Sequence, residues 1–215
     1  MGRYYPGGFS VIPPDTLYFV TITVIDWVDV FTRDEYKRIV ISSLDYCRRH
    51  KGLVIYAFVL MTNHLHLIVS HDDGKEGLSK VFRDFKKYTS RAVIAAIKDN
   101  PQESRRQWLL KHFDENNIKA NQDASCSVSK SRHPTHKKNY HLWQRGYDAY
   151  CICNIRHLRQ KVDYLHENPV RAGIVAKPWE YLYSSFSNYC GNDPILEVDF
   201  LDLGIEDPTK PIKTW

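Results

Sequence analysis

Leu53-Val-Ile-Tyr-Ala-Phe-Val-Leu-Met-Thr-Asn-His-Leu-His-Leu-Ile-Val-Ser70 contains two short aliphatic runs with a break between them. Residues 53–60 are rich in β-branched and aromatic side chains, and a run of this length is typical of a buried strand. The run from His64 to Ser70 is mostly aliphatic and predicts a second strand. We therefore expect Met61-Thr62-Asn63 to form a turn or bulge between two strands.

A strand and a helix are predicted before this segment. Leu17 to Ile25 has the composition and length of a strand and follows the turn-forming Pro13-Pro14-Asp15. Thr32-Arg-Asp-Glu35 has the pattern of a capping box, in which two side chains satisfy each other's backbone N–H groups. It predicts a helix that ends at Lys51-Gly52. The apolar residues of this helix recur at spacings of three and four: Tyr36, Ile39, Val40, Leu44 and Cys47.

Two more helices are predicted after the segment. One runs from Leu78 to about Lys98 and ends at Asn100-Pro101, with Leu78, Val81, Phe82, Phe85 and Tyr88 on its apolar side. The other begins behind Asn154 as N-cap and stops before Asn168-Pro169. Its apolar residues are Ile155, Leu158, Val162 and Leu165. The order of elements predicts an α+β fold with a mainly antiparallel central sheet and flanking helices.

Length and composition predict one domain. The chain has 215 residues, of which 43% are hydrophobic and 26% charged, as in soluble globular proteins. We assign residues 1–190 to the domain, residues 116–139 to a mobile loop poor in apolar residues, and residues 191–215 to a C-terminal tail. No apolar run approaches the roughly 20 residues that cross a bilayer, and no secretory signal is evident. A cytoplasmic protein with five free thiols and no membrane partner is expected.

The positive charge is concentrated in one region. Residues 75–138 contain 15 Lys and Arg against 7 Asp and Glu, a surplus of +8, so the rest of a chain of net charge +5 sums to −3. A local basic surplus is typical of a protein that binds a polyanion, since Lys and Arg that neutralise phosphates release counterions. Charge alone leaves open the alternative that a positive face only maintains solubility.

His64 and His66 form the sharpest chemical motif. Side chains at positions i and i+2 of a strand project from the same face, so both imidazoles can bind one divalent cation. Two histidines need a third ligand and water to complete the coordination. An isolated His-x-His is weak as a signal, because most such pairs are ordinary surface or hydrogen-bonded residues.

Three separated blocks identify a family. Met61-Thr-Asn-His-Leu-His-Leu-Ile-Val69 resembles the HUH motif (His, hydrophobic, His) of single-tyrosine transposases, in particular REP-associated tyrosine transposases. Leu142-Trp-Gln-Arg-Gly-Tyr147 resembles the Trp-Gln-x-x-Tyr segment of that branch. The third block, Tyr164-Leu-His-Glu-Asn-Pro-Val-Arg-Ala-Gly-Ile-Val175 with Trp179 and Tyr183-Ser-Ser185, resembles its C-terminal signature. The resemblance spans residues 18–189, without the loop 116–139.

This resemblance implies a ferredoxin-like, RRM-like HUH nuclease fold and the cleavage and rejoining of single-stranded DNA at hairpin-associated sites. A metal ion, Mg²⁺ or Mn²⁺, held by His64 and His66 would polarise the scissile phosphate. A tyrosine would attack it and leave a 5′-phosphotyrosine and a free 3′-OH. Tyr147 matches the nucleophile, with Tyr150 as the alternative. The resemblance also implies single-stranded or hairpin DNA as partner, a nucleoid-associated location and either a monomer or a homodimer.

The proposed chemistry is physically reasonable but leaves one ligand open. A tyrosine hydroxyl has a pKa near 10, so it is a poor nucleophile at pH 7 unless a Lewis acid stabilises the developing charge. Family members commonly place His, Glu or Gln a turn beyond the tyrosine, where this chain has Tyr150 and Cys151. Neither suits magnesium. Asp148, His141 or a water remain as candidates for the third ligand.

The basic region supplies candidate DNA contacts. Phosphate contacts are predicted from residues with guanidinium or ammonium groups, namely Lys80, Arg83, Lys86, Lys87, Arg91, Arg145 and Arg171. Tyr88, Trp108 and His112 are candidates for stacking on unpaired bases.

Two other functions remain compatible with the sequence. One is a catalytically impaired relative that binds repeat hairpins without cutting them. The other is a metal-dependent phosphoesterase in which the two histidines activate water.

Overall fold

A computed structural model describes residues 17–71, 77–114, 139–191 and 193–200. The predicted loop 116–139, except for its last residue, and the turn at Pro13-Pro14-Asp15 lie outside these residues. Among the helices that the structure describes, none has the length and apolar character needed to cross a membrane.

The centre of the molecule is an antiparallel sheet with the strand order β2-β3-β1-β4. Its strands are β1 (Tyr18–Thr23), β2 (Leu53–Leu60), β3 (His64–His71) and β4 (Asp148–Cys151). The segment 53–71 forms the predicted pair of strands, and β1 pairs with β3. The predicted α+β fold with a mainly antiparallel sheet is confirmed.

The fourth strand was not predicted from sequence. β4 has only four residues, two of them exposed, so it shows no hydrophobic alternation that would mark a strand. It forms because the free edge of β1 accepts it, with Thr21 opposite Asp148 and Phe19 opposite Tyr150. Tyr150 and Cys151 therefore belong to a strand rather than to the helix that follows.

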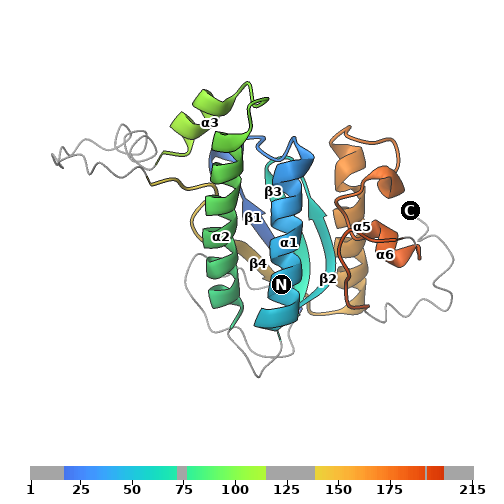
Figure 1. Cartoon of the computed structure of the whole chain (residues 1–215). Helices are drawn as coiled ribbons and strands as arrows, with labels where there is room; N and C mark the ends of the chain where they lie inside the picture. The colour runs from blue at the N-terminus through green and yellow to red at the C-terminus, as the bar shows by residue number, and fades with distance from the viewer. Residues whose placement is uncertain (1–16, 72–76, 115–138, 192, 201–215) are drawn as a thin grey trace, which may run out of the picture.

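Helices pack against the sheet as Figure 1 shows, with α1 (Asp34–Lys51) and α2 (Leu78–Asp99) side by side in front of the strands. α5 (Ile155–Arg171) lies apart from them and contacts β2 and β3. Short elements complete the fold: η1 (Ile25–Trp27), α3 (Arg106–His112), η2 (Pro178–Glu180) and α6 (Phe186–Tyr189). Because side chains alternate along a strand, Val20 and Ile22 point to one face of the sheet, and Phe19 and Thr21 to the other.

The predicted capping box at the start of α1 is wrong. Arg33 is the N-cap, and no side chain caps the helix. Thr32 Oγ1 instead accepts a hydrogen bond from Arg105 Nη2 at 2.8 Å, and Glu35 Oε2 accepts one from Asn100 Nδ2 at 3.1 Å. Both side chains thus connect the start of α1 to the segment between α2 and α3. Such tertiary contacts cannot be read from the local spacing of the residues. At the other end, Gly52 closes the helix as predicted, with φ of 70°.

Two further details of the helices differ from expectation. α5 continues through Pro169 to Arg171 rather than stopping before Asn168. A proline so close to the C-terminal end removes a single helical hydrogen bond, and its buried ring contributes to packing. In α2, Tyr88 is 61% exposed, and Thr89 occupies the buried face in its place. Asn154 caps α5 as predicted, its side chain accepting from His157 N at 2.8 Å.

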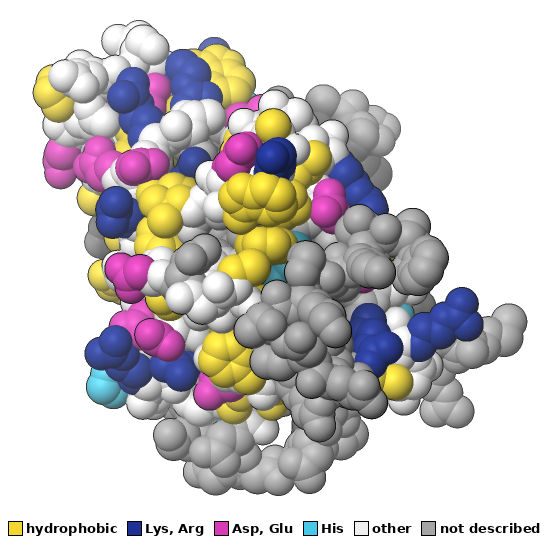
Figure 2. Space-filling model, turned by 90° about the vertical axis from the view of Figure 1, so that its right-hand side faces the viewer, with side chains coloured by type: hydrophobic (Ala, Val, Ile, Leu, Met, Phe, Trp, Pro, Cys, Tyr) yellow, Lys and Arg dark blue, Asp and Glu magenta, His cyan; other side chains and the backbone are white. Residues whose placement is uncertain are grey.

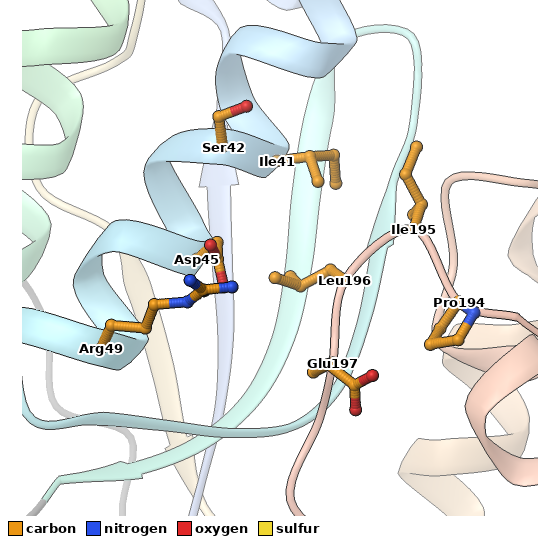
Figure 3. A pocket seen from close by; sticks show the side chains of 8 residues that line it. All are labelled: Ile41, Ser42, Asp45, Arg49, Pro194, Ile195, Leu196 and Glu197. Carbon is orange, nitrogen blue, oxygen red and sulfur yellow. The ribbon is translucent and has the colours of Figure 1, made fainter.

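The chain beyond residue 190 is part of the same packed structure where it is described. Leu196 and Val198 are buried, and Asp199 N donates to Ile55 O of β2 at 2.8 Å. Between this segment and α1 lies a pocket of about 310 Å³, shown in Figure 3, with the Asp45–Arg49 ion pair on its wall. Its lining residues come from α1 and 194–197, so it is separate from the strands that carry the histidines.

Burial of His166 makes the stability of the fold depend on pH. Its ring is fully buried on α5, Nε2 lies 2.9 Å from Ser185 Oγ, and burial lowers its pKa from 6.5 to about 3. Between pH 6.5 and about 3, His166 is protonated in the unfolded chain and neutral in the folded chain. The free energy of unfolding therefore falls as the pH falls.

We expect His166→Gln to make this fall less steep by about one proton per molecule unfolded, measured by urea unfolding at a series of pH values. His50→Gln, at an exposed position at the end of α1, controls for the loss of a histidine as such. An unchanged slope in His166→Gln would show that the buried ring is not the group that titrates.

Candidate functional site

His64 and His66 lie at the start of β3 and point to the same side of the sheet, as predicted. Their ring centroids are 4.6 Å apart. In the register of the sheet they face Thr23 and Thr21 of β1, respectively. His66 is 6% exposed, and His64 is half-buried. Solvent therefore reaches His64 more than His66.

Polar neighbours hold both rings through their Nδ1 atoms. His64 Nδ1 lies 2.7 Å from Asn63 Oδ1, and the amide nitrogen of Asn63 donates to Trp27 O at 3.1 Å and to Asp29 Oδ1 at 2.8 Å. His66 Nδ1 lies 2.9 Å from Thr21 Oγ1. Because the acceptor on Asn63 requires a proton on His64 Nδ1, the lone pair of that ring is on Nε2. A hydrogen bond from the far nitrogen is also the usual support of a metal-binding histidine.

Burial keeps both imidazoles neutral. The pKa of His66 falls to about 3, chiefly because its ring is buried and further because a protonated His66 would be repelled by a protonated His64 and by Lys161. The pKa of His64 is also lowered by burial, against the opposing effect of the Asp29 carboxylate. Neutral imidazoles at pH 7 are the form that binds a metal ion.

Tyr164 of α5 lies against His66. Its ring centroid is 5.7 Å from that of His66 and 6.0 Å from that of Phe19. Lys161 Nζ lies 5.7 Å from the Tyr164 centroid, and the Arg171 guanidinium lies 5.5 Å from it. The structure thus brings two imidazoles, a phenol and two cations together between β3 and α5.

Tyr150 occupies the same face of the sheet, whereas Tyr147 does not. Tyr150 is 39% exposed on β4, and its centroid is 5.8 Å from Lys161 Nζ. Tyr147 packs edge-on against Phe82 of α2 at 5.0 Å, and its hydroxyl lies 3.2 Å from Ser79 Oγ. The expectation that Tyr147 joins the histidines is not met, because the residue just before β4 turns toward α2 while Asp148 and Tyr150 face the other way.

Lys86, a predicted DNA contact, binds backbone carbonyl groups of the turn that contains Tyr147. Its ammonium group donates to Gln144 O and to Gly146 O, both at 2.5 Å. Burial lowers the pKa of Lys86 to about 8. It therefore anchors the turn that leads into β4, and at pH 7 two of its donors are occupied by carbonyl groups.

The remaining predicted DNA contacts are divided between the two sides of the sheet. Lys80, Arg83, Lys87 and Arg91 are exposed on α2, and Arg145 is exposed in the adjoining turn. These residues lie on the α1–α2 side, whereas Arg171 lies beside Tyr164 on the histidine side. Figure 2 shows the side of the molecule where α5 and α6 lie: in this view Lys and Arg stand among Asp, Glu and hydrophobic side chains.

Four residues on one stripe of α5, next to the predicted DNA contact Arg171, were not assigned a role from the sequence. His157, Lys161, Tyr164, Asn168 and Arg171 recur at spacings of four and three, which places them along one face of the helix. Next to this stripe runs the buried one, with Leu158, Val162 and Leu165. The helical periodicity that predicts the apolar face of α5 also places Tyr164 and Lys161 together on an adjacent polar face.

The donors present fit a divalent cation held by two imidazoles, with oxygen ligands to complete it. Among the described residues, no group of three His, Cys, Asp or Glu side chains is placed to hold a metal ion. A third protein ligand must then be an amide, a hydroxyl or none. Asn168 lies one turn beyond Tyr164 on α5, and its amide nitrogen is buried without a hydrogen-bond partner. Of the earlier candidates, Asp148 is exposed on β4 opposite Thr21, and His141 is exposed before it.

The fold has a counterpart among solved structures. The chain is similar to a REP-associated tyrosine transposase bound to a REP hairpin, with a TM-score of 0.55, 17% sequence identity and coverage of 98% of this chain and 100% of that chain. Searches with protein-family models and against curated proteins gave no match. The α+β architecture of a tyrosine transposase is thus shared over nearly the whole chain, and at this identity the similarity concerns the fold.

The contacts of Lys86 predict an effect on stability. Replacing Lys86 by Met leaves two carbonyl groups without their donor, so we expect the free energy of unfolding to fall by about 1–3 kcal/mol. Lys87→Met changes the exposed neighbour and should stay within about 0.5 kcal/mol of the unmodified protein. Equilibrium unfolding in urea measures both. Equal stabilities of the two variants would contradict the anchoring role.

Proposed function

We propose that this protein is a metal-dependent single-stranded DNA endonuclease and strand transferase, a transposase that forms a 5′-phosphotyrosine intermediate at hairpin-associated sites. The observation that carries the proposal is the placement of Tyr164 against His66, at 5.7 Å between ring centroids, among two neutral imidazoles and two cations. The shared fold of a transposase that is bound to a REP hairpin supports DNA as the substrate.

Tyr164 replaces Tyr147 as the proposed nucleophile. Its hydroxyl oxygen would attack the scissile phosphorus, forming the Tyr–O–P bond as the P–O3′ bond breaks. The phenolic proton passes to solvent, and the 3′ oxygen takes up a proton from solvent and is released as a hydroxyl group. A covalent phosphotyrosine retains the energy of the broken bond, so a second 3′ end can reverse the step without ATP.

Cationic side chains around Tyr164 have a clear role in such a step. Lys161 and Arg171 lie on either side of the phenol along α5, and both would attract the DNA phosphate and stabilise negative charge as it develops on oxygen. Lys161 Nζ also lies 4.8 Å from the Phe19 centroid and 5.7 Å from the Tyr164 centroid, and a charge beside apolar rings acts more strongly than one surrounded by water.

His64 and His66 would hold the metal ion through Nε2, with the oxygen of Asn168, water and the substrate as further ligands. Mg²⁺ or Mn²⁺ bound there would act as a Lewis acid on the scissile phosphate. Asn168 lies one turn beyond Tyr164, the position at which the family resemblance implies a metal ligand. One turn beyond Tyr147 the chain has Tyr150 and Cys151, which do not suit magnesium, whereas beyond Tyr164 it has an amide oxygen.

The nucleophile is tested by the covalent product. We expect wild-type protein, labelled hairpin DNA with single-stranded flanks and Mg²⁺ or Mn²⁺ to give a protein–DNA adduct on a denaturing gel, and Tyr164→Phe to abolish it. Tyr147→Phe and Tyr150→Phe are the control variants, because each removes one phenol hydroxyl, Tyr147 on the α2 side and Tyr150 on β4 beside Lys161. An adduct that survives in Tyr164→Phe but disappears in Tyr147→Phe would reinstate Tyr147. Cleavage that survives all three changes would indicate a phosphoesterase that uses water.

The metal site is tested by binding. Asn63→Ala removes the acceptor of His64 Nδ1, and loss of such a supporting group typically weakens metal affinity about 10–100-fold. We expect His64→Ala to weaken Mn²⁺ binding at least as much, measured by electron paramagnetic resonance of the free ion. Wild-type Mn²⁺ affinity in both variants would refute the assignment.

A catalytically impaired DNA-binding protein is the second candidate function. The observation in its favour is the lack of a third His, Cys, Asp or Glu beside the pair among the described residues. The adduct assay separates the two functions, since this candidate binds the hairpin in a native gel and yields no covalent product with either metal.

A further inference from the structure

An exposed tryptophan stands beside the histidine pair in an unusual backbone conformation. Trp27 is 58% exposed, and its ring lies edge-on to that of His64, with 5.6 Å between centroids. Asp26 and Trp27 have φ of 52° and 56°, and they are the two non-glycine residues with positive φ in the described chain. Such a conformation is costly for a residue with a side chain, so the surrounding structure must impose it.

The contacts around this turn explain how Trp27 is held. Trp27 N donates to Val24 O at 3.1 Å, and Trp27 O accepts from Asn63 Nδ2, the same amide group that is bound to Asp29. Asn63 also supports His64 through its oxygen. One side chain therefore holds both the His64 ring and the backbone of Trp27.

A second exposed indole lies near the same turn. Asp26 Oδ2 lies 3.0 Å from His112 Nε2, and the His112 ring stacks on Trp108 with 5.3 Å between centroids. Trp108 is 53% exposed. Trp27 is thus the exposed indole in contact with the histidine pair, and Trp108 lies farther along, beyond Asp26 and His112.

We propose that Trp27 is a stacking platform for the unpaired base next to the phosphate that the site cleaves. This inference rests on the proposed function. A phosphate at His64 and His66 would place the neighbouring nucleotide near Trp27, whose ring lies 5.6 Å from that of His64, and an exposed aromatic ring binds any base by stacking. The ligand is a nucleobase of single-stranded DNA, and the contact selects unpaired over paired nucleotides rather than a particular sequence.

Binding without cleavage provides the test. The Tyr164→Phe protein is titrated with hairpin DNA that carries a single-stranded flank, in the presence of Mn²⁺, with an abasic site introduced at one flank position at a time. We expect one position at which the abasic site weakens binding by roughly 5- to 150-fold, and Trp27→Ala or Trp27→Gly to weaken binding of the intact DNA similarly. In the Trp27 variants the abasic site at that position should have no further effect.

Two controls separate stacking from folding. Trp27→Gly suits a φ of 56° and relieves the backbone strain, so a loss of affinity in this variant is not due to a destabilised turn. Trp179→Ala removes an equally exposed indole on η2 and should bind as the parent protein does. If the abasic penalty is the same with and without Trp27, the stacking proposal is overturned while the proposed function stands. If the Tyr164→Phe protein binds no hairpin DNA, both are overturned.

Discussion

The register between β1 and β3 is the constraint on which the site depends. It places His66 opposite Thr21 and His64 opposite Thr23, so both imidazoles face α5 while Leu65 and Leu67 enter the core on the other side. A slip of one residue would exchange these faces and bury both histidines among aliphatic side chains. Because the aliphatic residues of β3 cannot be exposed without losing their burial energy, the hydrophobic core itself holds the histidines in place.

Burial beside α5 then sets the charges of the site. The same packing that makes His66 nearly inaccessible lowers its pKa to about 3, so the imidazoles stay neutral and able to bind a metal ion. Positive charge comes instead from Lys161 and Arg171, on the polar stripe of α5 next to Tyr164. The charges at the site thus depend on α5, which follows β3 in the sequence by about 100 residues.

Several residues with reactive side chains serve the architecture. Lys86 holds the turn before β4, Tyr147 packs on α2, and His166 is buried against Ser185. Residue type alone does not distinguish such roles from chemical ones, because the same groups make good hydrogen-bond partners in a core. The strong basic surplus of residues 75–138 likewise includes side chains on the layer opposite the histidines. The net charge of a sequence region does not show where its charged side chains lie relative to the site.

The sequence by itself determined the helices with a clear apolar stripe, the strands with an aliphatic run and the pairing of two histidines on one strand face, because these depend on local periodicity. It did not reveal β4, whose four residues form a strand only when the edge of β1 is available. Nor did it reveal which tyrosine meets the histidines. Tyr147 and Tyr164 both belong to recognisable motifs, and only the packing of α5 against β2 and β3 decided between them. That choice rests on contacts between distant segments, which no local pattern encodes.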